Sequence, residues 1–278
     1  MKYKPLELPL YWRDYHRYRH PLVKHKLVWF RKFRGRRWIY GQNFGDYLSI
    51  VVVGELLRRA GKLNTLPPVN GRLLAIGSII HFAQDNDIIW GSGVNGKIDR
   101  ADHRFSNLDI RMLRGPRTKL FLEEIGIRVD CNVFGDPALL IPHLFPELKY
   151  RPKKDKHIVI PNLNELAHVQ KLVPSEVRLV SPVGYWRKIT EEILTSESVV
   201  TSSLHGLILA EVFGVPVRFV HPIGGETLFK YEDYLEGTGR VMSTIPPSFD
   251  NGFSLEMGVS FPKPQVDITR MLESFPFS

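Results

Sequence analysis

Short apolar runs that end in small or polar residues recur along most of the chain. They predict strands at 72–78, 87–90, 108–113, 157–162, 178–182, 198–201 and 215–220. Helical segments follow several of them, at 119–125, 185–194, 204–213 and 227–235. Apolar strands that alternate with helices are typical of a parallel sheet covered by helices. The pattern therefore predicts an α/β fold.

A polar segment at 150–156 divides this pattern in two. Beyond Tyr150 and Pro152 it contains no apolar residue, which is the composition of an interdomain connection. We expect an N-terminal α/β half at 38–150 and a C-terminal α/β half at 151–278, with a ligand cleft between them. The C-terminal half includes a tail for which the sequence predicts little beyond residue 245.

A further helix is predicted from Tyr47 to Ala60 in the first half. Asp46 precedes it as a natural N-cap, and Gly61 follows its last turn. The glycines before Asp46 would let the backbone approach a ligand closely. This loop lacks the lysine of a phosphate-binding P-loop and the regular glycine spacing of a dinucleotide site.

Composition narrows the class of protein. The 278 residues are 43% hydrophobic, as in globular proteins, and the single cysteine, Cys131, fits a reducing compartment. The N-terminus lacks the apolar core of a secretory signal, and the apolar runs are too short to span a bilayer. These features predict a cytoplasmic location, which includes peripheral attachment to the inner face of the membrane.

The positive charge is concentrated at the N-terminus. Residues 1–40 hold 12 Lys and Arg against two acidic residues, a net of +10, whereas the whole chain carries +9. Aromatic side chains are interleaved with these cations, so residues 1–37 form a basic aromatic arm. Such an arm suits an anionic membrane surface or nucleic acid, or it is a solvated or partner-docking tail. Nucleic acid is the least favoured of these partners.

His205 is the first candidate for chemistry. It lies just after the strand at 198–201, where a parallel sheet gathers its ligands. Ser202 and Ser203 suit the N-cap of the next helix, whose free N–H groups attract an anion. A histidine there can exchange a proton near neutral pH, although a buried structural histidine is the plainer interpretation.

Five motifs give the chain a family resemblance in their order and spacing. They are Asn43-Phe44-Gly45-Asp46, Trp90-Gly91-Ser92-Gly93, Arg114-Gly115-Pro116-Arg117-Thr118, Gly135-Asp136-Pro137-Ala138 and Ser202-Ser203-Leu204-His205-Gly206. Together they resemble polysaccharide pyruvyl transferases, and among these the ketal-forming enzymes of succinoglycan biosynthesis. The resemblance covers about residues 38 to 240 and omits the arm.

The resemblance implies two Rossmann-like halves facing a cleft, as in GT-B glycosyltransferases. It also implies transfer of the enolpyruvyl group of phosphoenolpyruvate onto a sugar, which forms a pyruvate ketal and releases phosphate. The acceptor would be a bacterial-type surface polysaccharide, an oligosaccharide or a lipid-linked precursor. His205 matches the acid/base histidine of the family. Ser203 stands where some members carry an arginine that binds the donor.

The donor carries a phosphate and a carboxylate, so its site needs cations and N–H groups. Arg114 and Arg117, between a strand and a helix, are the predicted cations, because arginine binds either anion bidentately. Asp136 is a candidate for orienting His205. The remaining predicted substrate contacts are Ser202, Ser203, Gly206, Asn43, Asp46, Gly91, Ser92 and Gly93. No metal site is expected, because the histidines are scattered, and no cofactor beyond the donor is expected.

Two other functions stay open at this point. A GT-B-like glycosyltransferase would bind a nucleotide sugar instead of phosphoenolpyruvate. Alternatively, the basic arm would tether a non-catalytic α/β domain to membrane or nucleic acid. The serine at position 203 keeps this second alternative open, because it lacks the charge that the site requires.

Overall fold

The computed structural model describes residues 10, 14, 17–18, 27–28, 43–62 and 70–277. They form two parallel sheets, which confirms the α/β prediction. The first sheet has the order β1 (Leu27–Val28), β2 (Leu73–Leu74), β3 (Asp87–Trp90), β4 (Leu108–Met112). The second has the order β6 (Arg178–Leu179), β5 (His157–Ile160), β7 (Ser198–Thr201), β8 (Val217–Phe219). The closer likeness to GT-B enzymes stays a prediction.

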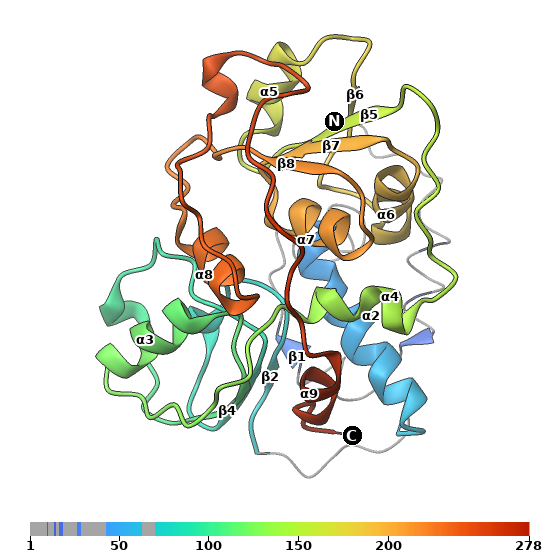
Figure 1. The fold of residues 1–278 in the computed structure, drawn as a ribbon. Helices are drawn as coiled ribbons and strands as arrows, with labels where there is room; N and C mark the ends of the chain where they lie inside the picture. The colour runs from blue at the N-terminus through green and yellow to red at the C-terminus, as the bar shows by residue number, and fades with distance from the viewer. Residues whose placement is uncertain are drawn as a thin grey trace.

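Helices lie between and beside the sheets (Figure 1). They are α2 (Phe44–Arg59), α3 (Pro116–Glu124), α4 (Ile141–Leu144), α5 (Leu166–Leu172), α6 (Trp186–Leu194), α7 (Leu204–Val212), α8 (Phe229–Gly237) and α9 (Ile268–Glu273). Ser203 caps α7, as predicted, by accepting a hydrogen bond from the Gly206 backbone N–H at 3.3 Å. The predicted cap of α2 is wrong. Asn43 accepts from the Gly45 N–H at 3.0 Å, so Asp46 lies inside the first turn.

Helix α2 joins the two halves. Its sequence is mostly apolar between Tyr47 and Leu57, and its buried residues lie on every face of the helix. The Phe44 backbone N–H donates to the Pro182 carbonyl of the second half at 2.9 Å. One apolar cluster contains α2 together with Ile88 of the first sheet and Ile158 of the second. The two halves therefore share a core, which places the N-terminus of α2 at their boundary.

The end of the chain returns to the first half, so the predicted C-terminal half is not a separate unit. Helix α8 lies beside α3, and α9 lies near the first sheet (Figure 1). The Trp90 indole N–H donates to Ser274 Oγ at 3.0 Å. This crossing brings the acidic residues of α8 to the first half, where they meet its arginines.

The described residues of the predicted arm belong to the fold rather than extend from it. Leu27 and Val28 pair in parallel with β2, and Tyr18 is buried against Gly54 of α2. The Trp186 indole N–H donates to Asp14 Oδ2 at 2.8 Å in a buried position. The high charge of the segment conceals these anchoring positions in the sequence. Most of the arm lies outside the described residues, so its membrane attachment stays a prediction.

Candidate active site

A cavity of about 360 Å³ lies between the two halves. The first half lines it with Asn43, Asp46, Gly77, Ser78, Ile79, His81, Asn95, Lys97 and Ile98. The second half contributes Asn162, Leu163, Asn164, Ser203, Leu204, His205, Glu226 and Lys230. Most of these residues follow the carboxyl ends of β2, β3, β5, β7 and β8, where ligands of parallel sheets bind. We call it the interdomain cavity.

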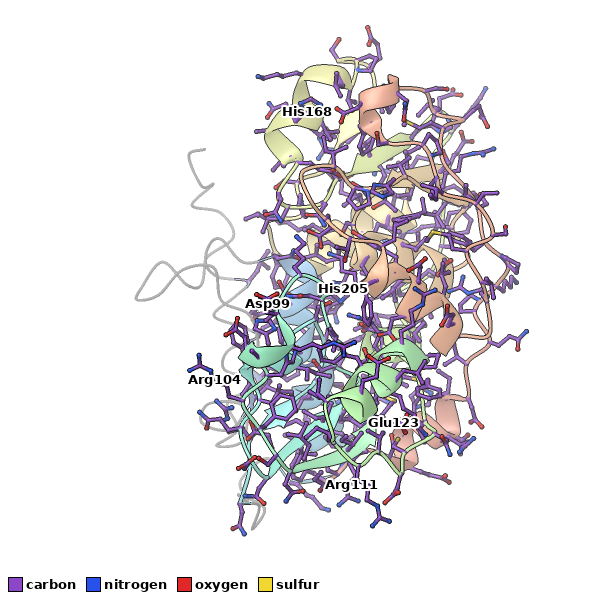
Figure 2. The ribbon with its side chains drawn as sticks, turned by 90° about the vertical axis from the view of Figure 1, so that its left-hand side faces the viewer. Asp99, Arg104, Arg111, Glu123, His168 and His205 are labelled. Carbon is purple, nitrogen blue, oxygen red and sulfur yellow. The ribbon has the colours of Figure 1, made fainter. Side chains whose placement is uncertain are left out.

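His205 is held at this boundary from two sides. Its ring is 10% exposed, and its Nε2 lies 3.6 Å from Asp136 Oδ2. A Cβ atom built on Gly45 would lie 2.0 Å from His205 Nδ1, so only glycine allows the ring to pack against α2 there. The ring of Phe44 meets it edge-on, with centroids 6.5 Å apart. Figure 2 shows His205 near the middle of the molecule.

Asp136 and His205 face each other with open hydrogen-bonding capacity. Asp136 is fully buried, and its Oδ1 accepts from the Ala138 N–H at 2.9 Å. Neither Asp136 Oδ2 nor His205 Nε2 has a hydrogen-bond partner among the described residues. The Asp136 carboxyl is therefore placed to orient the imidazole ring, and an imidazole can act as a general acid or base.

Asp46 adds a second titratable group to the same wall. Burial raises the pKa of its carboxyl to about 6, against the attraction of His205 and Lys230, and the charge of Asp136 adds to the rise. A carboxyl with this pKa changes its charge close to neutral pH. General bases are most efficient when their pKa lies near the working pH. Asp46 was predicted as a helix cap and substrate contact, but its position also suits proton transfer.

The predicted arginines do not line the interdomain cavity. Arg114 is fully buried, and its guanidinium bonds Asp233 Oδ2 at 3.0 Å, Ser78 Oγ at 2.5 Å and the Val94 carbonyl at 2.6 Å. Arg117 pairs with Glu232 and Glu236 of α8. These acidic partners lie on α8, which packs against α3 of the first half. Arg114 supports the cavity wall through Ser78, and the lysines Lys97 and Lys230 line the cavity instead.

The small residues predicted as ligand contacts make close packing contacts. Gly91 has a φ of +89°, and a Cβ there would lie 2.3 Å from the Pro137 ring. A Cβ on Gly93 would lie 2.4 Å from the Arg114 guanidinium carbon, and one on Gly206 would lie 2.6 Å from a threonine hydroxyl. Ser92 donates to the Gly77 carbonyl at 2.9 Å. Of the predicted contacts, Asn43, Asp46 and Ser203 line the cavity with His205.

Glu165 is a functional candidate that the sequence did not indicate. Its Oε1 accepts from the Asn162 N–H at 3.1 Å and from the Ser202 hydroxyl, and its Oε2 accepts from the Ile223 N–H at 2.8 Å. One buried carboxyl therefore ties the loops after β5, β7 and β8. Burial raises its pKa to about 7, although the two backbone N–H groups lower it. Asn162, Ser78 and Lys97 could have been found, because the first two end predicted strands and Lys97 lies in the loop after another.

Comparison with known proteins identifies the family. The profile of the polysaccharide pyruvyl transferase family matches residues 6–220, which is more than half of the chain. The chain belongs to the polysaccharide pyruvyl transferase family. Membership makes it an enzyme of the pyruvyl transferase class and confirms the resemblance seen in the sequence. The match also begins within the predicted arm, in agreement with the buried positions found there.

Individual relatives are distant. The succinoglycan biosynthesis protein ExoV of Rhizobium meliloti is 28% identical over 206 residues, which cover 71% of this chain and 62% of that protein. An uncharacterised protein, L143, of Acanthamoeba polyphaga mimivirus is 25% identical over 213 residues, 70% of each chain. The crystal structure of an uncharacterised Klebsiella pneumoniae protein aligns with a TM-score of 0.46 at 15% identity, covering 83% of this chain and 93% of that one.

The raised pKa of Glu165 predicts how stability changes with pH. The folded pKa of about 7 exceeds the ordinary value of 4.5. The folded state therefore binds the proton more tightly, and stability falls as pH rises from about 4.5 through 7. Glu165→Gln mimics the neutral form of the carboxyl. The Asn162 backbone N–H also donates to Ser202 Oγ, so it keeps an acceptor in the variant. We expect it to raise the free energy of unfolding at pH 8 by on the order of 3 kcal/mol.

Urea unfolding at pH 5 and pH 8 measures this effect. The gain should shrink at pH 5, where the wild-type carboxyl is itself protonated. Glu176→Gln, an exposed position, serves as the matched control and should change stability little at either pH. A Glu165→Gln protein that is less stable than wild type at pH 8 would contradict the account.

Proposed function

We propose that this enzyme transfers the enolpyruvyl group of phosphoenolpyruvate onto a sugar of a polysaccharide or of its lipid-linked precursor, forming a pyruvate ketal. Family membership supports pyruvyl transfer in polysaccharide biosynthesis. The observation that carries the finer proposal is the arrangement of His205, Asp136 and Asp46 at a cavity between the two halves. These groups match the proton transfers that ketal formation requires.

Ketal formation moves two protons. A sugar hydroxyl adds to C2 of the donor while the methylene carbon takes up one proton and becomes a methyl group. A second hydroxyl then replaces the phosphate on C2, and its proton leaves with the phosphate. The reaction therefore needs an acid near the methylene carbon and a base near the attacking hydroxyl.

The two roles follow from the surroundings of each group. His205 lines the cavity with its Nε2 3.6 Å from the buried Asp136 carboxyl, which can orient the ring, so His205 is assigned to donate the proton to the methylene carbon. Asp46, ionised above its pKa of about 6, accepts the proton of the attacking hydroxyl. The two groups belong to different halves but line the same cavity, so both can face substrates bound there.

Substitution of His205 tests the proposal. Incubation with phosphoenolpyruvate and total glycolipid should release phosphate in an acceptor-dependent reaction. His205→Ala should reduce the rate about 1000-fold, within the usual range for a lost acid/base group. His168→Ala, on exposed α5 at the far end of the second half (Figure 2), is the matched control and should keep the wild-type rate. Release without acceptor, or in His205→Ala at the wild-type rate, overturns the assignment.

The pKa of Asp46 predicts how the catalytic rate falls at acidic pH. Its carboxyl takes up a proton as pH falls below about 6 and can then no longer act as a base, so kcat/KM should fall with an apparent pKa near 6. Asp46→Asn should lower kcat by about 100-fold and remove that limb. Steady-state rates between pH 5 and pH 8 measure both effects. An unchanged acid limb in Asp46→Asn would assign the ionisation to another group.

A further inference from the structure

A carboxylate lies between two lysines in the wall of the interdomain cavity. Glu226 Oε1 accepts from Lys230 Nζ at 2.6 Å, and its Oε2 accepts from Lys97 Nζ. The Glu226 side chain is only 6% exposed. Burial raises its pKa, but the two lysines lower it further, so the pKa lies below its ordinary value. The carboxylate therefore stays charged at neutral pH.

This arrangement neutralises the cavity that an anionic donor must enter. Lys97 and Lys230 are its lysines, and Asp46 and Glu226 carry the opposing negative charges. A donor with a phosphate and a carboxylate would meet no excess positive charge from these four side chains. If Glu226 turns away, the two ammonium groups outweigh Asp46 and lie on either side of one anion-sized position. The charge balance therefore favours replacement of the Glu226 carboxylate, between the two lysines, by an anionic group of the ligand.

The local backbone allows Glu226 to be the member that moves. Lys230 lies in the first turn of α8, and a Cβ on Gly96, beside Lys97, would lie 2.6 Å from both Thr227 Oγ1 and Phe229 Cβ. This close packing restrains the backbone beside both lysines and on the C-terminal side of Glu226. On its N-terminal side, Glu226 follows Gly224 and Gly225, which have φ values of +75° and +77° and open space around them. The glycine pair can change conformation at little steric cost.

We propose that Lys97 and Lys230 form the subsite for the phosphoryl group of the donor, and that Glu226 occupies this subsite until that group displaces it. The assignment rests on the proposed function, in which the donor is phosphoenolpyruvate. The two lysines would supply the positive charge that Ser203 lacks. Arg114 and Arg117 do not supply it, because they pair with acidic residues of α8. The two lysines come from the loop after β3 and from helix α8, which pack together, so the bound phosphoryl group would lie where these two segments meet.

Calorimetric titration with inorganic phosphate at low salt tests the subsite. Glu226→Gln removes the competing charge and should bind phosphate about tenfold more tightly than wild type, while Lys97→Met and Lys230→Met should each bind about tenfold more weakly. Glu256→Gln, an exposed partner of Arg218, is the matched control and should bind as wild type does. Titration with pyruvate, which has the carboxylate but no phosphate, should show no such dependence on the lysines.

Each outcome decides the proposal. Weaker or unchanged phosphate binding by Glu226→Gln overturns it, as does unchanged binding by both lysine variants or no phosphate binding by any variant. Dependence of pyruvate binding on the lysines would assign them to the carboxylate and also overturn it. Glu226→Ala replaces Glu226→Gln if thermal melting shows that the latter is unfolded. If phosphate binds as predicted but no variant releases phosphate from phosphoenolpyruvate, the proposed function fails and the subsite stands.

Discussion

The contact between the His205 ring and the backbone of Gly45 is the constraint on which the site depends. It joins the N-terminal turns of α2 and α7, which belong to different halves of the chain. Because Gly45 has no side chain, the His205 ring of α7 can pack directly against the backbone of α2. That packing places Asp46, the next residue of α2, at the cavity wall and turns the ring toward Asp136. The proton-transfer groups are therefore assembled by packing between the halves.

The structure keeps the two halves together in several ways. The apolar cluster around α2 includes side chains from both sheets, so moving the halves apart would expose buried surface. The Arg114–Asp233 pair is fully buried and ties α8 to the loop after β4. A buried ion pair strongly resists the removal of either partner, because the remaining charge would be unpaired. These contacts hold the wall around α2 and α8, whereas the glycine pair that precedes Glu226 has open space around it.

Local patterns in the sequence predicted much of this. The apolar strands, the helix after Ser203 and the place of His205 follow from short-range regularities, and their motifs indicated the family. The helix cap of α2 was assigned to Asp46 because both Asn43 and Asp46 are good caps, and only the backbone distinguishes them. That error concealed the position of Asp46 in the first turn, where its carboxyl faces the cavity.

Long-range contacts could not be predicted in the same way. Arg114 and Arg117 lie at a strand–helix junction, as the sequence suggested, but α8 returns from more than 100 residues away to bind them. Glu165 was overlooked because two of its three partners, Ser202 and Ile223, come from loops distant in the sequence. Leu27 and Tyr18 were overlooked because the surrounding charge dominates the composition of their segment.

The most direct test of the account adds one methyl group to the contact between Gly45 and His205. Gly45→Ala should lower kcat for phosphate release by about 100-fold, because a misplaced acid/base group loses its alignment with the substrate. Gly184→Ala, where the new Cβ would lie 3.4 Å from its nearest neighbour, adds the same methyl group and should keep the wild-type rate. A folded Gly45→Ala enzyme with wild-type kcat would show that the position of His205 does not determine catalysis.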